Sequence, residues 1–412
     1  MRLEQVTRKR AAIEERTFGP EAPVTAASYS WIGLALSRRG KDAEAEPFYR
    51  RALEIDRKAL GEDQGQTLLA TNNLAGLLER QRRFAEAEPL RRALLVSAST
   101  TFGEKSAETA AAAAALGDVL RAQGRAREAE PLYRQALEAD AVGAGEADPR
   151  IAADLGALAV TLDALGRHVE AEPLHRRSLA IRLKVFGERD AASAQAYARM
   201  GANLDAQGRH VEAEPLYRAA LATDREVRGE RHPTTAADLA DLGRNLDAQG
   251  RARDAEPLLR QALDLRRHAL GERDAETAAS YAALGANFAA RGRPAEAERL
   301  HRRALETLRA VKGGRDPTAA EVEIALANDL AALNRSKEAE PLLREALEIR
   351  RTALGEAHPD TARAYDALAE NQHRLAADGA AEGLAAKAVA IVRARRAADL
   401  RAGGSDPDAA LR

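Results

Sequence analysis

The stretch Ala43-Glu44-Ala45-Glu46-Pro47-Phe48-Tyr49-Arg50-Arg51-Ala52-Leu53 decides the fold of this chain, because it recurs in varied form along the sequence. Its proline returns every 42 residues, although one step carries Arg299 and the last carries Gly383. The remaining steps are Pro89, Pro131, Pro173, Pro215, Pro257 and Pro341. A glycine series from Gly19 to Gly355 keeps the same period. A fixed period of this size predicts a repeat array.

Composition agrees with an array of closely packed helices. The chain has 412 residues, 45% of them hydrophobic and only 3% aromatic, so alanine and leucine must supply the core. Length alone would suggest two or three domains, but the unbroken period predicts one quasi-linear domain. The net charge of −1 argues against nonspecific binding of nucleic acid. The absence of cysteine excludes disulfides, thiolate metal sites and a catalytic thiol.

From the sequence we expect neither a membrane span nor a signal peptide. No run approaches the ~20 apolar residues of a membrane span, and Met1-Arg2-Leu3-Glu4-Gln5 lacks the apolar core of a signal peptide. We therefore expect a cytoplasmic protein with no membrane partner. The excess of arginine and alanine over lysine suits a GC-rich bacterial genome.

Each repeat reads as two antiparallel helices joined by a short turn. In the unit from Ala22 to Gly61, Pro23 is suited to the first turn of a helix over 24–39. A second helix is expected over 43–59, and Gly61 closes it in a left-handed cap. Alanine, leucine, glutamate and arginine favour helix over the strands of a propeller blade.

Small residues at fixed positions identify the repeat class. Ile32-Gly33 forms a large-small pair in the first helix, and Ala45, Tyr49 and Ala52 follow in the second. This pattern resembles the tetratricopeptide repeat. The unit is eight residues longer than usual and carries sequences such as His358-Pro359, which resembles the kinesin-light-chain subclass. The resemblance implies an all-α, right-handed superhelical solenoid of stacked antiparallel helix pairs, with eighteen to nineteen helices and no strands.

The period sets the expected boundaries. Residues 1–19 align with the second half of a repeat and are predicted to form a capping helix, or else a repeat that is cut. Residues 20–396 hold about nine 42-residue helix-turn-helix repeats, and residues 397–412 a flexible tail. Ser97, Ser99, Thr100 and Thr101 predict an early end to the second helix of the second repeat.

Two rows of charge repeat along the chain and read as structural. Glu46 and Arg50 are four residues apart, and seven later repeats carry the same pair, a spacing that stabilises helices. A row of basic residues that begins at Lys41 marks the turn between the helices. Each of its members has an acid three residues on, beginning with Glu44. This neutralisation again argues against a nucleic-acid partner.

Nothing in the sequence marks a catalytic centre. His168 and His210 occupy equivalent positions one repeat apart, and a metal site needs more ligands than these two. His175 and His301 replace Tyr49 and are expected to be packing residues. Phosphate-binding loops and nucleophile elbows are absent. We predict a protein that is not an enzyme and has no cofactor and no metal.

The resemblance implies that the first helices line a concave groove that holds a partner protein or peptide. Carried over by position, the candidate groove residues are Arg38, Asn72, Arg80, Asp118, Arg121, Asp163, Asp205, Arg244 and Asp247. Asn203, Asn245, Asn287 and Asn371 stand four residues beyond the groove asparagine of kinesin light chains, and we expect them to bond neighbouring backbone.

The sign of the groove charge changes along the array. Asp163, Asp205 and Asp247 are expected to pair with the arginine four residues on, namely Arg167, Arg209 and Arg251. The earlier arginines have weaker local partners, which leaves them for carboxylate recognition. We therefore hypothesise that an acidic peptide docks on Arg38, Arg80 and Arg121.

The sequence as a whole predicts a non-enzymatic scaffold that binds a partner protein or peptide in its groove. One alternative is the regulatory or sensor module of a split protease or NTPase system that acts in trans. Another is a solenoid that associates with itself, and the oligomeric state stays open.

Overall fold

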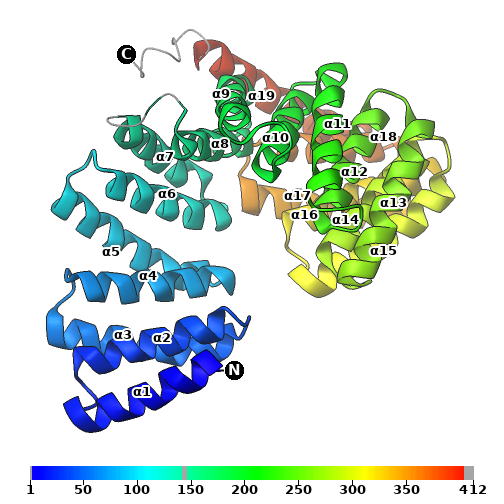
Figure 1. The fold of residues 1–412 in the computed structure, drawn as a ribbon. Helices are drawn as coiled ribbons and strands as arrows, with labels where there is room; N and C mark the ends of the chain where they lie inside the picture. Colours follow the sequence, from blue (N-terminus) through cyan, green and yellow to red (C-terminus); the bar gives the residue numbers. More distant parts are fainter. Residues whose placement is uncertain (1, 142–144, 146, 403–412) are drawn as a thin grey trace. The chain divides into compact units, whose positions relative to one another are not determined.

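The structure is a computed structural model that describes residues 2–141, 145 and 147–402. In this part of the chain it contains nineteen α-helices and no β-strand (Figure 1). The predicted all-α repeat solenoid is confirmed. The chain divides into two compact units, Met1–Leu165 and Gly166–Arg412.

Unit 1 contains the first eight helices. They are α1 (Arg2–Phe18), α2 (Pro23–Ser37), α3 (Asp42–Leu60), α4 (Gly65–Arg80), α5 (Phe84–Phe102), α6 (Ala107–Ala122), α7 (Ala126–Ala141) and α8 (Pro149–Ala164). Even-numbered helices are the first helices of their repeats, and odd-numbered helices are the second. Helix α1 packs against α2, in the place that the second helix of a preceding repeat would take. Its role as a cap stays a prediction.

Unit 2 contains the remaining eleven helices, which continue the same alternation. They are α9 (His168–Phe186), α10 (Ala191–Ala206), α11 (His210–Val227), α12 (Pro233–Ala248), α13 (Ala252–Leu270), α14 (Ala275–Ala290), α15 (Pro294–Lys312), α16 (Pro317–Ala332), α17 (Ser336–Leu354), α18 (Pro359–Arg374) and α19 (Asp378–Ala402).

A conserved geometry links each second helix to the next first helix. Gly61 ends α3 with φ +95°, and its N–H donates to Arg57 O at 3.2 Å. The Thr67 hydroxyl in α4 then donates back to Gly61 O at 2.7 Å. The same hydroxyl-to-glycine bond recurs at Thr25, Thr109, Ser193, Thr235, Thr277 and Thr361. This bond fixes the entry of seven first helices, whereas α8 and α16 carry Ile151 and Ala319 at that position and have no hydroxyl to donate.

The core of each repeat is built from a small residue that faces a large one. Tyr49 of α3 packs on Gly33 of α2, where an added Cβ would lie 2.8 Å from Tyr49 Cε1. Gly285 stands in the same relation to His301, whose side chain is buried, as is that of His175. The prediction that these histidines are packing residues is therefore confirmed. Ala45 and its equivalents from Ala87 to Ala339 are fully buried, so helix backbones approach closely there.

Two expectations about helix ends are wrong. Helix α5 does not end early but runs to Phe102, because the hydroxyls of Ser99 and Thr100 bond to Val96 O within the helix and leave its backbone undisturbed. Helix α19 continues to Ala402, past the predicted tail boundary at 397, since the alanine-rich sequence there favours helix. The rest of the predicted tail, 403–412, lies outside the described residues.

Candidate functional site

The first helices form the inner side of the curvature within each unit. In unit 2, α10, α12, α14, α16 and α18 each contact the next helix in that row, more closely than α11, α13, α15 and α17 contact one another. In unit 1, α2 contacts α4 and α6 contacts α8. A stack that is tighter along its first helices curves toward them. We call the exposed side of these helices the inner face.

Arg38 and Arg80 lie at the ends of α2 and α4 and are exposed. Within the described residues, no hydrogen bond or ion pair engages the side chain of Arg38. Arg80, by contrast, donates Nε to Asp42 Oδ2 at 3.1 Å and Nη2 to Asp42 Oδ1 at 3.2 Å. It also reaches Ser37 Oγ at 3.1 Å, and its guanidinium lowers the pKa of Asp42. The premise that Arg80 lacks a partner is wrong, because Asp42 of the preceding repeat reaches it.

Arg121 is also engaged. Its Nη2 donates to Asp118 Oδ1 at 2.9 Å, one turn earlier on α6, and its Nε donates to Tyr133 Oη at 3.3 Å. The buried Tyr133 in turn donates its hydroxyl to Asp118 at 2.8 Å. The structure therefore brings the candidates Asp118 and Arg121 together as a pair, and the premise of an unpaired arginine fails here as well.

Asn72 is exposed on α4, where its Oδ1 accepts from Arg91 Nη1 at 2.6 Å. Arg91 occupies the position that Tyr49 has in the first repeat, and its Nε also donates to Glu79 at 2.6 Å. The second repeat thus replaces an aromatic packing residue with an ion pair that crosses the inner face. Asp163, the last candidate of unit 1, lies half-buried near the end of α8.

In unit 2, the acidic candidates pair with side chains of other helices and not along their own helix. Asp205 lies 3.0 Å from His210 Nδ1 and accepts from Asn245 Nδ2 at 2.7 Å. Asp247 accepts from Asn287 Nδ2 at 2.7 Å, and burial raises the pKa of Asp247 to about 6. The expected pairs with Arg209 and Arg251 are wrong, because those arginines face the opposite way, toward glutamates of the second helices.

The asparagines behave as predicted. Asn203, Asn245, Asn287 and Asn371 each donate Nδ2 to the first backbone carbonyls of the preceding second helix, at 2.7–3.1 Å. These carbonyls belong to the first residue of the second helix, and the asparagine reaches them from the next repeat. These side chains hold neighbouring repeats together, and the prediction that they bond backbone is confirmed.

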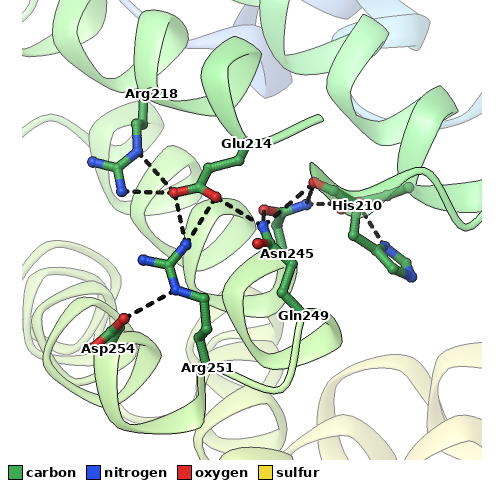
Figure 2. Close-up of polar contacts among 8 residues, drawn as sticks. His210, Glu214, Arg218, Asn245, Gln249, Arg251 and Asp254 are labelled. Carbon is green, nitrogen blue, oxygen red and sulfur yellow. Dashed lines mark hydrogen bonds and ion pairs between the residues drawn. The ribbon is translucent and has the colours of Figure 1, made fainter. Parts of the chain in front are cut away.

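Figure 2 shows the polar seam between repeats, formed by Glu214, Arg218, Gln249, Arg251 and Asp254. Glu214 accepts from Arg218 at 2.7 Å on its own helix, and from Gln249 at 3.0 Å and Arg251 at 2.9 Å in the next repeat. The hydrogen bond from Arg218 is the main cause that lowers the pKa of Glu214 to about 2. Arg251 also donates Nε to Asp254 at 3.0 Å.

Both predicted charge rows are thus paired as expected along their helices. Helical spacing did not predict that five arginines of the turn row have a further partner, a glutamate 37 residues earlier. It joins Arg83 to Glu46, Arg125 to Glu88, Arg209 to Glu172, Arg251 to Glu214 and Arg335 to Glu298. The sequence does carry a signal for these ion pairs, because the glutamate and the arginine both recur at this 37-residue spacing.

The one candidate in unit 2 that carries a cation on the inner face is Arg244 of α12. Its guanidinium pairs with Asp241 one turn earlier, yet 56% of its side chain is exposed. On the neighbouring helices, the exposed residues Ala202 and Ala286 present only methyl groups. Arg244 therefore lies between two helices that carry alanine at the equivalent position.

The described residues contain neither a cluster of metal ligands nor a membrane-spanning helix. No group of three or more histidine, cysteine, aspartate or glutamate side chains there is placed to hold a metal ion. None of the helices is both long enough and apolar enough to cross a membrane.

Stacked helix pairs with a tight inner row and a paired seam define a helical-repeat protein of the solenoid class. The family model of the tetratricopeptide repeat matches residues 25–64, 66–141, 150–226, 193–268, 254–310 and 318–394. The chain belongs to the tetratricopeptide repeat family.

Solved structures give the same fold. A Rap protein complexed with competence and sporulation factor is 16% identical, with a TM-score of 0.60, and the match covers 89% of this chain and 98% of that one. A signal transduction ATPase with a tetratricopeptide repeat sensor, from Pyrococcus horikoshii, is 15% identical with a TM-score of 0.52. That match covers 88% of this chain and 52% of the ATPase.

A putative kinesin light chain from Podosopora anserina is 21% identical with a TM-score of 0.41, over 50% of this chain and 98% of that one. Arrays of this kinesin-light-chain-like type are thus among the similar structures. No curated protein matches the sequence. At these identities the similarity establishes the fold alone.

Proposed function

We propose that this chain is a non-enzymatic scaffold that binds an extended segment of a partner protein on the inner face of unit 2. Tetratricopeptide arrays generally mediate protein–protein interaction, and solenoids of this kind use extended concave surfaces to do so. The observation that carries the proposal is the exposed Arg244 between the exposed alanines Ala202 and Ala286. An exposed cation between two exposed alanines leaves room for an extended backbone and offers it a polar anchor.

The fold relative that fits this proposal is the Rap protein, whose solved structure is a complex with competence and sporulation factor. Because the seam residues already pair with one another, a ligand on the outer edge would have to break ion pairs. Beside Arg244 on the inner face it would compete with the Arg244–Asp241 pair. Binding on the inner face would therefore disrupt fewer existing ion pairs than binding on the outer edge.

A displayed peptide library selected on the full chain tests the proposal. Peptides that bind wild type should lose affinity at least tenfold for Arg244→Glu and for Ala286→Trp, which fills the inner face. Arg344→Glu is the matched control, since Arg344 is an exposed arginine of the outer helix α17. If the selected peptides bind all three variants as they bind wild type, the inner face of unit 2 is not the site.

The acidic-segment hypothesis for unit 1 remains a proposal in narrower form. Arg38 is available without rearrangement, but an acidic peptide would have to displace Asp42 from Arg80 and Asp118 from Arg121. We expect acidic peptides to bind weakly and to lose that binding in Arg38→Ala. If Arg38→Ala and the triple variant with Arg80→Ala and Arg121→Ala both bind as wild type at low salt, the hypothesis is wrong.

The second candidate function is a sensor module that acts in trans on an enzyme. The support is the Pyrococcus horikoshii ATPase, in which a tetratricopeptide repeat sensor belongs to the same chain. This reading predicts a partner with protease or NTPase activity, and a rate that changes when the present chain is added. Assay of a co-purified enzyme with and without the chain distinguishes it from a passive scaffold.

A further inference from the structure

Two interfaces between neighbouring repeats each contain a pair of buried aspartates. In unit 2, Asp224 of α11 and Asp238 of α12 stand 42 residues before Arg266 and Ser280, which contact each other directly, and 5% and 6% of their surface is exposed. In unit 1, Asp140 of α7 and Asp154 of α8 form the equivalent pair, with 5% and 7% exposed. The two pairs are 84 residues apart in sequence, which is two repeats.

The same position holds other chemistry in the other repeats. At the α1–α2 interface Ser28 donates to Glu14 at 2.5 Å, and at α13–α14 Arg266 donates to Ser280 at 2.9 Å. At the α15–α16 interface, Leu308 and Val322 stand there. Each of these alternatives has a donor for every acceptor or no polar group at all. Two ionised aspartates would offer each other only hydrogen-bond acceptors and no donor.

The arrangement of charge around each pair decides which carboxyl holds a proton. Arg228 Nε lies 3.1 Å from Asp224 Oδ1, and Arg150 Nη1 lies 3.3 Å from Asp140 Oδ1. The arginine therefore favours the charged form of the aspartate on the second helix. Within the described residues, no ion pair joins a cation to its partner on the first helix, Asp238 or Asp154, so the proton is expected on that carboxyl.

Further charged side chains lie near the unit 2 pair and its unit 1 equivalent. Asp241, one turn along α12, adds a second negative charge beside Asp238, and it is itself paired with Arg244. Arg266 from α13 interacts with Asp241 and Arg244. In unit 1, Asp118 of α6 adds negative charge near Asp154. Burial is the main cause that raises the pKa of Asp238 to about 8 and that of Asp154 to about 7.

We propose that the α11–α12 and α7–α8 interfaces are each closed by one proton shared between two buried aspartates, so that rising pH loosens these two repeat contacts. In the unfolded or locally opened chain an aspartate keeps its proton only below about pH 4. Opening therefore releases a proton at neutral pH, and it becomes more favourable as pH rises toward the folded pKa. Above that pKa the effect levels off, because the proton is then lost from the closed form as well.

Hydrogen exchange of the full chain between pH 6 and pH 9 tests this, with rates expressed as protection factors to remove the intrinsic effect of pH. Amides of α11 and α12 should lose protection by about tenfold per pH unit up to about pH 8. Amides of α13 and α14, where Arg266 and Ser280 stand at the same position, are the internal control and should lose none. Equal loss at both interfaces would overturn the proposal.

Variants distinguish an effect of the shared proton from a general loss of protection at alkaline pH. Asp238→Asn keeps the shape and the donor but cannot ionise, so protection of α11 and α12 should become independent of pH. Asp264→Asn makes the same change at an exposed site of α13 and should behave as wild type. If Asp238→Asn does not fold, Asp238→Ser reproduces the residue found at Ser280. A pH-dependent loss in α11 and α12 that persists in either substitution at 238 would refute the inference.

Discussion

The ring of Tyr49 fills the space beside Gly33, so that a Cβ at position 33 would lie 2.8 Å from Tyr49 Cε1. The same relation joins Gly117 to Tyr133, Gly201 to Tyr217, Gly243 to Leu259 and Gly285 to His301. Because both members of each pair come from the same repeat, this contact sets the distance between its two helices. Packing within the repeat therefore depends on the absence of one methyl group.

We expect Gly33→Leu to destabilise the chain by about 1–3 kcal/mol, because the larger residue forces Tyr49 out of its site. Thermal or urea unfolding measures the effect. Gly65→Leu is the control, since Gly65 lies in the first turn of α4 and has no atom within 4 Å of an added Cβ. Equal destabilisation by both substitutions would mean that the Gly33–Tyr49 contact is not limiting.

Glu214 joins two repeats, because it accepts from Arg218 on its own helix and from Gln249 and Arg251 on the next repeat. Glu214→Gln should lower the free energy of unfolding by about 1–3 kcal/mol, since it leaves partly buried donors without a charged acceptor. Glu306→Gln is the comparison at an exposed position of α15. It should stay within about 0.5 kcal/mol of wild type in the same unfolding experiment.

The pH dependence of Glu214 follows from its lowered pKa of about 2. A carboxyl whose folded pKa lies below its unfolded value stabilises the fold above the unfolded value of about 4.3 and loses that contribution as pH falls toward 2. The difference in stability between wild type and Glu214→Gln should therefore shrink between about pH 4.5 and pH 2. A difference that stays constant over this range would show that the charge of Glu214 contributes nothing.

His301 and Asp329 form a buried pair with Nδ1 and Oδ2 2.5 Å apart, while Nε2 lies 3.1 Å from Ala282 O. Other repeats place asparagine at the position of Asp329, as in Leu259 with Asn287. His301→Leu should cost about 3–5 kcal/mol, because it strands a buried carboxylate. Adding Asp329→Asn recreates the combination of the preceding repeat and should recover most of the loss. Denaturation of the single and double variants measures the coupling, and additive losses would contradict it.

The sequence by itself determined the repeat class. The 42-residue return of Pro47 and Gly61, the invariant Ala45 and the alternation of small and large residues depend on local spacing, which repeats identically in every unit. The same spacing predicted the pairs of Glu46 with Arg50 and of Lys41 with Glu44, since helix geometry brings residues three or four apart together.

Only the tertiary structure decided which charged side chains are already occupied. Arg80 bonds to Asp42 from 38 residues earlier, and Asn287 bonds to Asp247 from 40 residues earlier. Helical periodicity cannot predict these partners, because they depend on how one repeat is rotated against the next. The same rotation buries Asp224 against Asp238, although either residue alone reads as an ordinary polar position on its helix.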